Sequence, residues 1–415
     1  MATRVEARDV RAVAPSAIAV LAVLSLGHFV NDAYTAMLTP LLPEIRTAYG
    51  VSIARTAVLV AILSFVGSML QPFVGVVADR VDRRFLAALG PVLAGVGMTL
   101  MGYAPSFAAL GALITLAGVG SAIFHPSGAA YVALGARLQR RGLFAALFSA
   151  AGTVGVAAGP LVATMLDLHR LPFLMPLGLA VGLASYAITP SSVPASGAGR
   201  RRLGEYVALW RGPMRALWAT GVMRSLSTVS YQGLIGFALT ARGHAGHIGP
   251  SLAVFSLFAA AGGIIGGRVS DRVGRTTVLR SSILGTIPLF VALVYSSPSQ
   301  WWYYPLTALV GALVNANLPV AVVTAQEYAP DHVATASALM MGFTWGTAGV
   351  LFLAVGKLAD LTSPTTAMVA SILVLLPAFW VTVRLPEPAA LSPAAPRSAT
   401  LHPAPRSPGT RGRGA

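Results

Sequence analysis

The chain of 415 residues contains no cysteine and a single lysine, and only 10% of its residues are charged. The absence of cysteine excludes a disulfide framework and a thiolate metal site. Soluble proteins carry about 25% charged residues. With 55% hydrophobic residues, this chain has too little polar surface to cover a water-facing globule. The composition therefore indicates a membrane protein.

The apolar residues are grouped in runs of the length that a bilayer requires. A membrane-spanning helix needs about 20 mainly apolar residues. Twelve such runs are predicted at 16–42, 56–78, 85–104, 107–134, 143–166, 171–189, 216–241, 249–269, 278–297, 302–325, 334–358 and 366–384. The predicted fold class is an all-α integral membrane protein of twelve transmembrane helices in two pseudo-symmetric six-helix bundles. The domains are an N-terminal arm at 1–15, bundles at 16–189 and 216–384, a linker at 190–215 and a disordered tail at 385–415.

Basic residues predict the orientation of these spans. The net charge of +16 does not indicate nucleic-acid binding, because the basic residues follow the topology. If the N-terminus is cytoplasmic, 23 of the 29 Lys and Arg residues fall in inner segments and five in outer ones. Cytoplasmic loops carry such an excess, so both termini are predicted to be cytoplasmic.

Two loop motifs repeat 192 residues apart and suggest two related halves. Residues 75–84 read GVVADRVDRR, and residues 267–275 read GRVSDRVGR. They resemble the cytoplasmic loop motif of the major facilitator superfamily, except that Asp82 stands where Gly is expected. A tight turn followed by charges that pair with helix ends can latch one conformation. The residues with this predicted gating role are Asp79, Arg80, Arg83, Asp271, Arg272 and Arg275, together with Glu327 at the inner end of the tenth span.

A second repeat consists of small residues. The segment GTVGV at 152–156 recurs as GTAGV at 346–350. The spacing of Gly155, Gly159 and Pro160 resembles the antiporter motif of drug exporters. Small residues four apart also allow close helix packing, and that interpretation remains open.

Three longer stretches read GHFVNDAY at 27–34, IFHPSG at 123–128 and QEYAP at 326–330. Together they resemble the fosmidomycin resistance protein family of bacterial efflux transporters. The resemblance implies export driven by the proton gradient across the bacterial inner (cytoplasmic) membrane. It also implies a monomer that handles protons and a small molecule and that needs no cofactor. The family often has an acid after the His-Pro pair, where this chain has Ser127.

Polar residues inside the spans mark a predicted central cavity. His28, Asn31, Asp32 and Thr35 form one stripe in the first span, at helical spacing. Such a stripe must face protein or water rather than lipid. In the resembled superfamily, the first, fourth, seventh and tenth helices line the cavity. The other predicted substrate-binding residues lie on the last three of these helices and are His125, Arg224, Thr228, Tyr231, Gln232 and Asn317.

Two opposite charges occupy equivalent positions in the halves. Asp32 and Arg224 lie 192 residues apart, and a charge at bilayer depth is costly unless it has a partner or faces water. Asp32, with His125, is the predicted proton carrier, and Arg224 is the predicted anion-binding residue. Alternatively, Asp32 and Arg224 form a structural ion pair, and His125 bonds a backbone carbonyl beside Pro126.

The electrostatics leave the direction of transport open. If Asp32 pairs with Arg224, protonation of Asp32 frees Arg224 for an anion, which is the sign of symport. Antiport follows if ionised Asp32 accepts a hydrogen bond from a substrate N–H or O–H group. A sugar or organic-acid importer on the same fold is thus the alternative function. A membrane lipid enzyme is the remote one, because the sequence shows no metal-ligand spacing, phosphate loop or nucleophile arrangement.

Overall fold

The computed structural model describes residues 17–71, 74, 81–135, 141–191 and 209–388, and in this part of the chain it contains helices and no strand. The first half consists of α1 (Ala17–Ala36), α2 (Leu38–Tyr49), α3 (Ile53–Met69), α5 (Arg83–Thr99), α6 (Phe107–Gly135), α7 (Arg141–Arg170) and α8 (Met175–Ile188). The second consists of α10 (Gly212–Ala241), α11 (Ile248–Val273), α12 (Arg275–Tyr295), α13 (Tyr303–Tyr328), α14 (Val333–Ala338), α15 (Thr344–Leu361), α16 (Pro364–Leu373) and α17 (Leu375–Val383). These helices match the predicted spans closely, and the predicted all-α fold class is confirmed.

Proline explains two places where one predicted span is divided into two helices. Pro40 has no N–H to donate to the carbonyl of Ala36, and α1 ends at Ala36. Pro377 stands in the same relation to Leu373, where α16 ends. In α7 the backbone departs from helical geometry at Asp167, which has a φ of 58°. The fifth span therefore ends near the predicted residue 166, although a further helical turn follows it.

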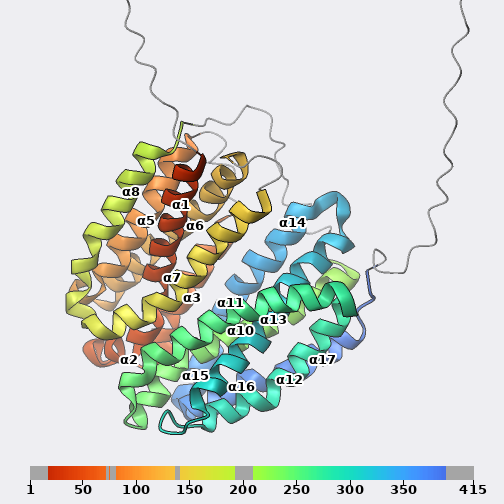
Figure 1. Cartoon of the computed structure of the whole chain (residues 1–415). Coiled ribbons are helices and arrows are strands. Elements are labelled where there is room, and N and C mark those ends of the chain that lie inside the picture. The colour runs from red at the N-terminus through yellow and green to blue at the C-terminus, as the bar shows by residue number, and fades with distance from the viewer. Residues whose placement is uncertain (1–16, 72–73, 75–80, 136–140, 192–208, 389–415) are drawn as a thin grey trace, which may run out of the picture.

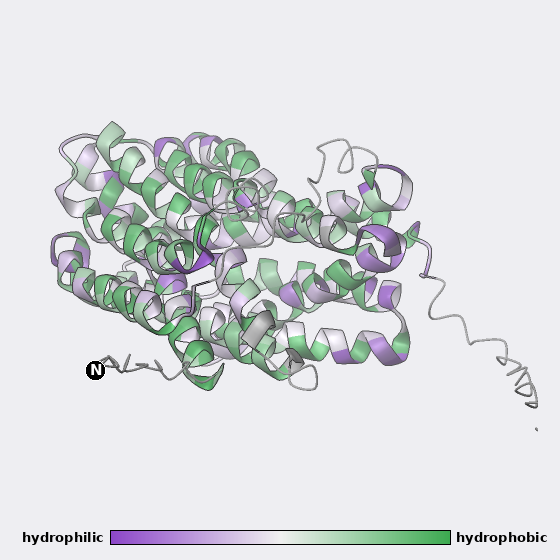
Figure 2. Ribbon diagram, turned by 90° about the horizontal axis from the view of Figure 1, so that it is seen from above, coloured by the Kyte–Doolittle hydropathy of each residue, from purple (hydrophilic) through white to green (hydrophobic). Residues whose placement is uncertain are grey.

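The outer faces of the helices are apolar. Figure 2 shows hydrophobic residues along most of the helices and hydrophilic residues mainly near helix ends. Large side chains such as Leu183 and Ile264 are 71% and 62% exposed in the isolated chain. Eight stretches of the described chain are long and apolar enough to cross a membrane, and the one at Leu143–Ile188 contains two predicted spans. Exposed apolar surface of this extent is suited to lipid.

The two halves meet along paired helices (Figure 1). α2 packs against α10, α3 against α15, and α7 against α11. At the end of the bundle where α3 begins, Asp360 of α15 caps the first turn of α3. Its carboxylate oxygens accept hydrogen bonds from the backbone N–H groups of Ile53 and Ala54, at 2.9 and 3.0 Å. This end of the molecule is thus closed by contacts between the halves.

Residues 385–388, which follow the last helix, contact the second half. The predicted disordered tail begins at 385, yet Leu385 is only 4% exposed and Glu387 bonds the start of α12. The predicted arm at 1–15 and the rest of the tail lie outside the described residues. Most of the predicted linker lies outside them too, and α10 begins within its last residues, at Gly212.

Candidate functional site

A cavity of about 860 Å³ lies between the halves, and helices of both contribute to its wall. It reaches from Thr39 and Pro160, in the middle of the bundle, to Val132, Ala145 and Met341. These last three lie near the end of α6, the start of α7 and the start of α15, so the cavity extends away from the end that Asp360 closes. Among the lining residues, the only side chains with titratable groups are His28, Asp32 and His125.

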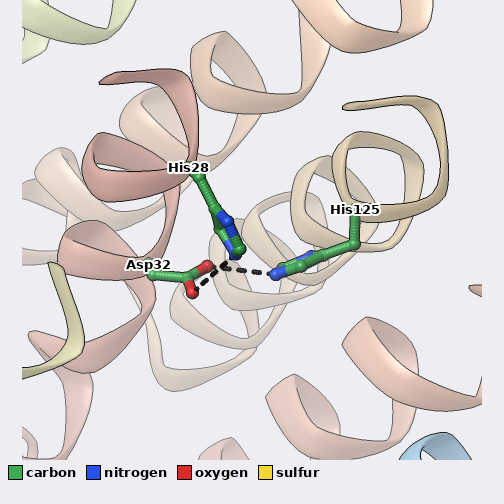
Figure 3. A group of neighbouring side chains, drawn as sticks. All are labelled: His28, Asp32 and His125. Carbon is green, nitrogen blue, oxygen red and sulfur yellow. Dashed lines mark ion pairs between the residues drawn. The ribbon is translucent and has the colours of Figure 1, made fainter. Parts of the chain in front are cut away.

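These three residues form a cluster that we call the His–Asp–His triad (Figure 3). The Nε2 atom of His28 lies 3.2 Å from one carboxylate oxygen of Asp32. The Nε2 atom of His125 lies 3.2 Å from the other. His28 and Asp32 occupy successive turns of α1, and His125 reaches them from α6. The fold therefore brings together the two residues predicted to couple protons, and it adds His28 as an equal member.

Backbone carbonyls fix the tautomer of both imidazole rings. The Nδ1 atom of His28 lies 2.8 Å from the carbonyl oxygen of Phe148, and that of His125 lies 2.8 Å from the carbonyl oxygen of Ser121. A carbonyl can only accept, so each Nδ1 carries the hydrogen. In a neutral ring, Nε2 is then a bare acceptor. Each Nε2 faces a carboxylate oxygen, so the triad joins acceptors to acceptors unless Nε2 is protonated or a cation or an outside donor lies among them.

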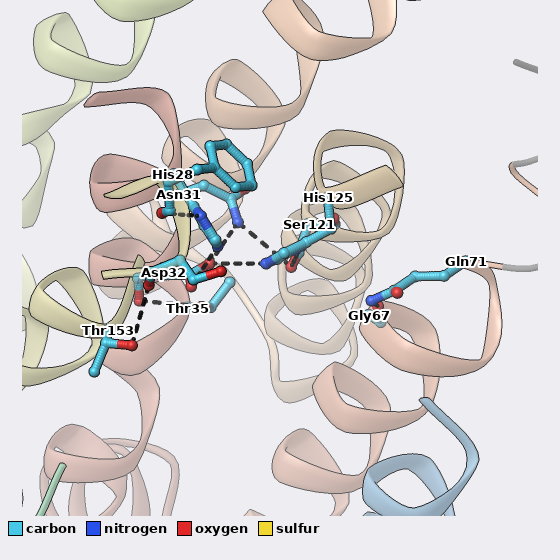
Figure 4. Close-up of polar contacts among 11 residues, drawn as sticks. His28, Asn31, Asp32, Thr35, Gly67, Gln71, Ser121, His125 and Thr153 are labelled. Atoms are coloured by element: carbon cyan, nitrogen blue, oxygen red, sulfur yellow. Dashed lines mark hydrogen bonds and ion pairs between the residues drawn. The ribbon is translucent and has the colours of Figure 1, made fainter. Parts of the chain in front are cut away.

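Further polar groups orient the carboxylate (Figure 4). The side-chain amide of Asn31 donates to an oxygen of Asp32 at 3.0 Å and approaches the hydroxyl of Ser121 at 3.4 Å. Asn31 is fully buried and does not line the cavity, so it acts behind Asp32 rather than in the cavity. Thr35 does line the cavity, and its hydroxyl donates to the backbone carbonyl of Asp32. The predicted stripe on α1 thus divides into cavity residues and a supporting residue.

The glycine motif packs α7 against α1 directly behind the triad. A side chain at Gly155 would collide with the carbonyl oxygen of Phe29, and one at Gly159 with that of Ala33. These two carbonyls lie one turn apart on either side of Asp32. Pro160 lines the cavity itself. The packing interpretation of the motif therefore has a direct structural basis, and it places the motif where it can support the triad.

The pairing of Asp32 with Arg224 is not found. Within the described chain no ion pair joins them, and Asp32 contacts the two histidines instead. The two side chains lie in different surroundings: Arg224 is only 2% exposed and does not line the cavity, whereas Asp32 does.

Arg224 is instead a buried cation without a neighbouring carboxylate in the described part of the chain. One terminal nitrogen donates to the hydroxyl of Ser225 at 2.7 Å, and the other has no hydrogen-bond partner. The guanidinium lies 5.3 Å from the centre of the Trp345 ring. Such a contact contributes about 0.5–2 kcal/mol and does not neutralise the charge. Trp345 lines the cavity, so Arg224 contacts a residue of the cavity wall.

The remaining predicted substrate residues are distributed unevenly. Gln232 lines the cavity. Tyr231 does not, because it is buried among aromatic rings, with the Phe255 ring centre at 4.7 Å. The hydroxyl of Thr228 donates back to the carbonyl of Arg224. Asn317 is 4% exposed and lies beside the cavity residue Leu318 without reaching the lining.

The second loop motif forms an ion-pair network. The guanidinium of Arg275, at the start of α12, lies 2.5 Å from the carboxylate of Asp271 and 3.2 Å from that of Glu327. It thereby connects the last turn of α11 and the last turn of α13. Arg272 is exposed and makes no such pair within the described residues. Asp79 and Arg80 of the first copy lie outside the described part of the chain. Arg83 begins α5.

The motif position that holds Asp82 in the first half and Gly274 in the second is the N-cap position of the following helix in each half. Asp82 caps α5 by accepting from the backbone N–H of Arg84 at 2.9 Å. Its counterpart Gly274 has a φ of 94° and no side chain with which to cap α12. There the carboxylate of Glu387 accepts from the backbone N–H groups of Arg275 and Thr276. Asp82, which departs from the family pattern, thus caps the helix that follows it. In the second half, the cap is Glu387, which lies after α17.

The surroundings of Glu387 favour its ionised form. Burial would raise the pKa of this carboxyl group. The hydrogen bonds from the Thr276 hydroxyl and from the backbone N–H groups of Thr276 and Arg275 outweigh that effect, and the pKa is lowered from its usual 4.5.

Three residues that contribute to the site or to its supporting structure are not identified from the sequence. Ser121 is one helical turn before His125, and the i−4 spacing is its only signal. Trp345 directly precedes the repeated GTAGV segment, but an aromatic residue at a helix surface is not specific. Glu387 lies in a segment whose composition indicates disorder. The missing cap at Gly274 is the one hint that a carboxylate must come from elsewhere.

Comparison with known proteins assigns the family. The sequence model of the Major Facilitator Superfamily matches residues 24–352 and 243–409. The chain belongs to the Major Facilitator Superfamily. It is 28% identical to the fosmidomycin resistance protein of Escherichia coli over 373 residues, which cover 84% of this chain and 88% of that protein. It is 26% identical to the MFS-type transporter YfnC of Bacillus subtilis over 373 residues, with coverage of 85% and 89%.

Solved transporter structures share the superfamily fold. A bacterial homologue of the human lysosomal transporter Spinster, in an inward-facing and unoccupied conformation, superposes with a TM-score of 0.72 at 15% identity. That comparison covers 89% of this chain and 97% of the homologue. The nucleoside transporter NupG superposes with a TM-score of 0.74 at 14% identity, with coverage of 88% and 99%. The family and the fold are those of transporters, as the sequence predicts.

Proposed function

We propose that this superfamily member exports a small anionic molecule in exchange for protons, by alternating access. The candidate substrate is a phosphonate such as fosmidomycin, for which a relative at 28% identity is named. The single observation that carries the exchange mechanism is the convergence of three acceptor groups on the cavity, the Nε2 atoms of His28 and His125 and the Asp32 carboxylate.

The convergence makes protons and substrate compete for the same lone pairs. Protons on the Nε2 atoms satisfy the triad as imidazolium–carboxylate pairs. A substrate O–H or N–H group satisfies the same acceptors by donating to them, which it cannot do while protons occupy them. Mutually exclusive binding is the thermodynamic condition for exchange. Because Asp32 does not contact Arg224 in the described structure, the electrostatic objection to antiport raised by that pair does not apply.

Arg224 is the proposed site for the anionic end of the substrate. A buried guanidinium with an unpartnered nitrogen favours an anion strongly, and its planar donors suit phosphonate, phosphate or carboxylate groups. In the described structure Arg224 does not line the cavity, but it contacts the indole of Trp345, which does. Access therefore requires a rearrangement of the cavity wall, either on substrate binding or as the halves change their relative orientation.

The closed and open ends suit alternating access. Asp360 holds α3 and α15 together at one end, while the cavity extends toward the other. With the predicted topology, the closed end is periplasmic and the cavity extends toward the cytoplasm. The ion pairs of Arg275 with Asp271 and Glu327 lie near the cytoplasmic end in this orientation and are proposed to be remade when the halves rock.

A paired susceptibility and uptake experiment tests this function. Cells lacking their own phosphonate exporters are compared with and without the protein, on a panel of antibiotics that includes fosmidomycin. Export predicts a raised inhibitory concentration for anionic compounds and lower cellular content. A matched Asp32→Asn chain, expressed to the same level, should give no protection. Greater accumulation of the compound in expressing cells would favour the importer instead.

A further inference from the structure

The triad has the geometry of a metal site as well as that of a proton site. Its potential ligand atoms, one from each residue, all lie within 4.8 Å of one another. A tetrahedral zinc ion with ligands at about 2.0–2.2 Å separates neighbouring ligand atoms by about 3.4 Å. Each Nε2 lies 3.2 Å from a different oxygen of the Asp32 carboxylate, which is close to that separation. Small side-chain adjustments would therefore place the three residues around one ion.

The surroundings of the ligands support this interpretation. Metal-binding histidines almost always donate their other ring N–H to a carbonyl, carboxylate or water, which fixes the tautomer that leaves the ligand nitrogen free. His28 and His125 both do so, to the carbonyls of Phe148 and Ser121. The carboxylate of Asp32 is held in turn by the amide of Asn31. These contacts leave three ligand atoms bare and oriented before any ion arrives.

The ligand set selects the class of metal. Two imidazole nitrogens and one carboxylate suit divalent transition-metal ions such as zinc, iron, cobalt and nickel. Magnesium and calcium require oxygen ligands and are disfavoured. Three protein ligands leave at least one coordination position open, as in catalytic zinc sites. The triad residues line the cavity, so that position faces the space where substrate is proposed to bind.

We propose that the His–Asp–His triad binds one divalent transition-metal ion, with zinc as the best match, through Nε2 of His28, Nε2 of His125 and the carboxylate of Asp32. The ion occupies the lone pairs that otherwise take protons or substrate donors. Metal binding itself is independent of the proposed function. The bound ion should also block transport, and this second expectation rests on the proposed function.

Binding is measured on purified, tag-free full-length chain in detergent, after treatment with EDTA and its removal. Co²⁺ is added, and the d–d absorption of the bound ion is recorded together with the stoichiometry. We expect one Co²⁺ per chain, displaced by Zn²⁺ and not by Mg²⁺. His28→Gln and His125→Gln each remove one ligand and should weaken binding by about 100-fold or more. Asp32→Asn tests the third ligand with almost no change in shape.

A second histidine pair provides the matched control. His244 and His247 lie with ring centres 6.1 Å apart and away from the cavity lining. The double variant His244→Gln, His247→Gln should keep full Co²⁺ binding. Binding that survives in the three triad variants, or that disappears in this control, overturns the assignment, as does a wild-type chain that takes up no Co²⁺. Thermal unfolding of each variant confirms that it is folded.

The transport assay separates the two proposals. Substrate export is measured in vesicles with EDTA and then with added Zn²⁺. Export in EDTA with inhibition by Zn²⁺ supports both. Export in EDTA from a chain that binds no Co²⁺ removes the metal site and leaves the proposed function standing. Stoichiometric Co²⁺ binding by a chain that exports nothing removes the proposed function and leaves the metal site standing.

Discussion

Replacing Asp32 by Asn should separate substrate movement from proton movement. Each Nε2 of the triad lies 3.2 Å from a carboxylate oxygen. At that distance, an imidazolium and a carboxylate attract each other by about 5 kcal/mol at an effective dielectric constant of about 20. Asn is almost isosteric but neutral, so this attraction is lost. Since about 1.4 kcal/mol is a factor of ten, the affinity of the triad for a proton falls by about a thousandfold or more.

The assay follows substrate accumulation in proteoliposomes with an imposed pH difference. One pH unit supplies about 1.4 kcal/mol per proton, enough for about a tenfold substrate gradient in one-for-one exchange. The wild-type chain should approach that gradient, and the Asp32→Asn chain should reach none. Exchange of labelled for unlabelled substrate, which needs no proton, should persist in the variant because Arg224 is intact. An Asp32→Asn chain that still builds a gradient would refute the assignment of the triad as the coupling site.

Three other predictions concern the second half of the chain and the contact between the halves. Arg224→Ala should abolish transport of anionic substrates, and Arg224→Lys should restore it only in part, because a lysine lacks the planar pair of donors. Transport of matched anionic and neutral compounds measures this effect, and an equal loss of both would contradict it. Asp360→Asn should weaken the cap between the halves by about 0.5–2 kcal/mol and raise the population that is open at that end by about 2- to 30-fold. Because the chain has no cysteine, a Thr39→Cys change gives a unique thiol in the cavity. A membrane-impermeant maleimide added outside should label this thiol faster in the Asp360→Asn background. An unchanged labelling rate would contradict a gating role for the cap. Glu387→Gln should destabilise the chain by about 1 kcal/mol at neutral pH by weakening the cap on α12. The pKa of Glu387 is lowered on folding, so its stabilising effect is present above its usual value of 4.5 and is lost as the pH falls below it. Thermal unfolding of wild type and variant should therefore converge at low pH, and a constant difference would exclude the ionised cap.

The fold was largely predictable because bilayer physics leaves few alternatives. Within the described residues, every predicted span contains helical structure, and the proline-induced breaks follow from the missing N–H group of Pro40 and Pro377. The end of the fifth span near residue 166 was also predicted, since Asp167 interrupts the apolar run. These features depend on hydropathy and local backbone chemistry, which are read directly from the sequence.

The candidate site was predictable in part. His28 and Asp32 share a helix face, so their proximity follows from spacing alone. His125 lies on another helix, 97 residues after His28, and no spacing rule relates them. For the same reason, the sequence shows no metal-binding pattern although the fold brings three ligand atoms together.

Arg224 shows where sequence reasoning fails. The repeat places Arg224 at the same depth as Asp32, but depth does not determine the direction of a side chain around its helix. In the fold, the guanidinium donates to Ser225 and lies against the Trp345 ring of α15. Such contacts between helices far apart in sequence are not encoded in hydropathy.

The most direct test of exchange at the triad is the movement of protons when substrate binds. Purified full-length chain, treated with EDTA, is placed in weakly buffered detergent solution with a pH indicator, and fosmidomycin or another transported anion is added. We predict that substrate binding releases protons into the solution, up to two for each chain, and that Asp32→Asn releases none. Uptake of protons on substrate binding would show that the two bind together and would contradict proton-coupled export.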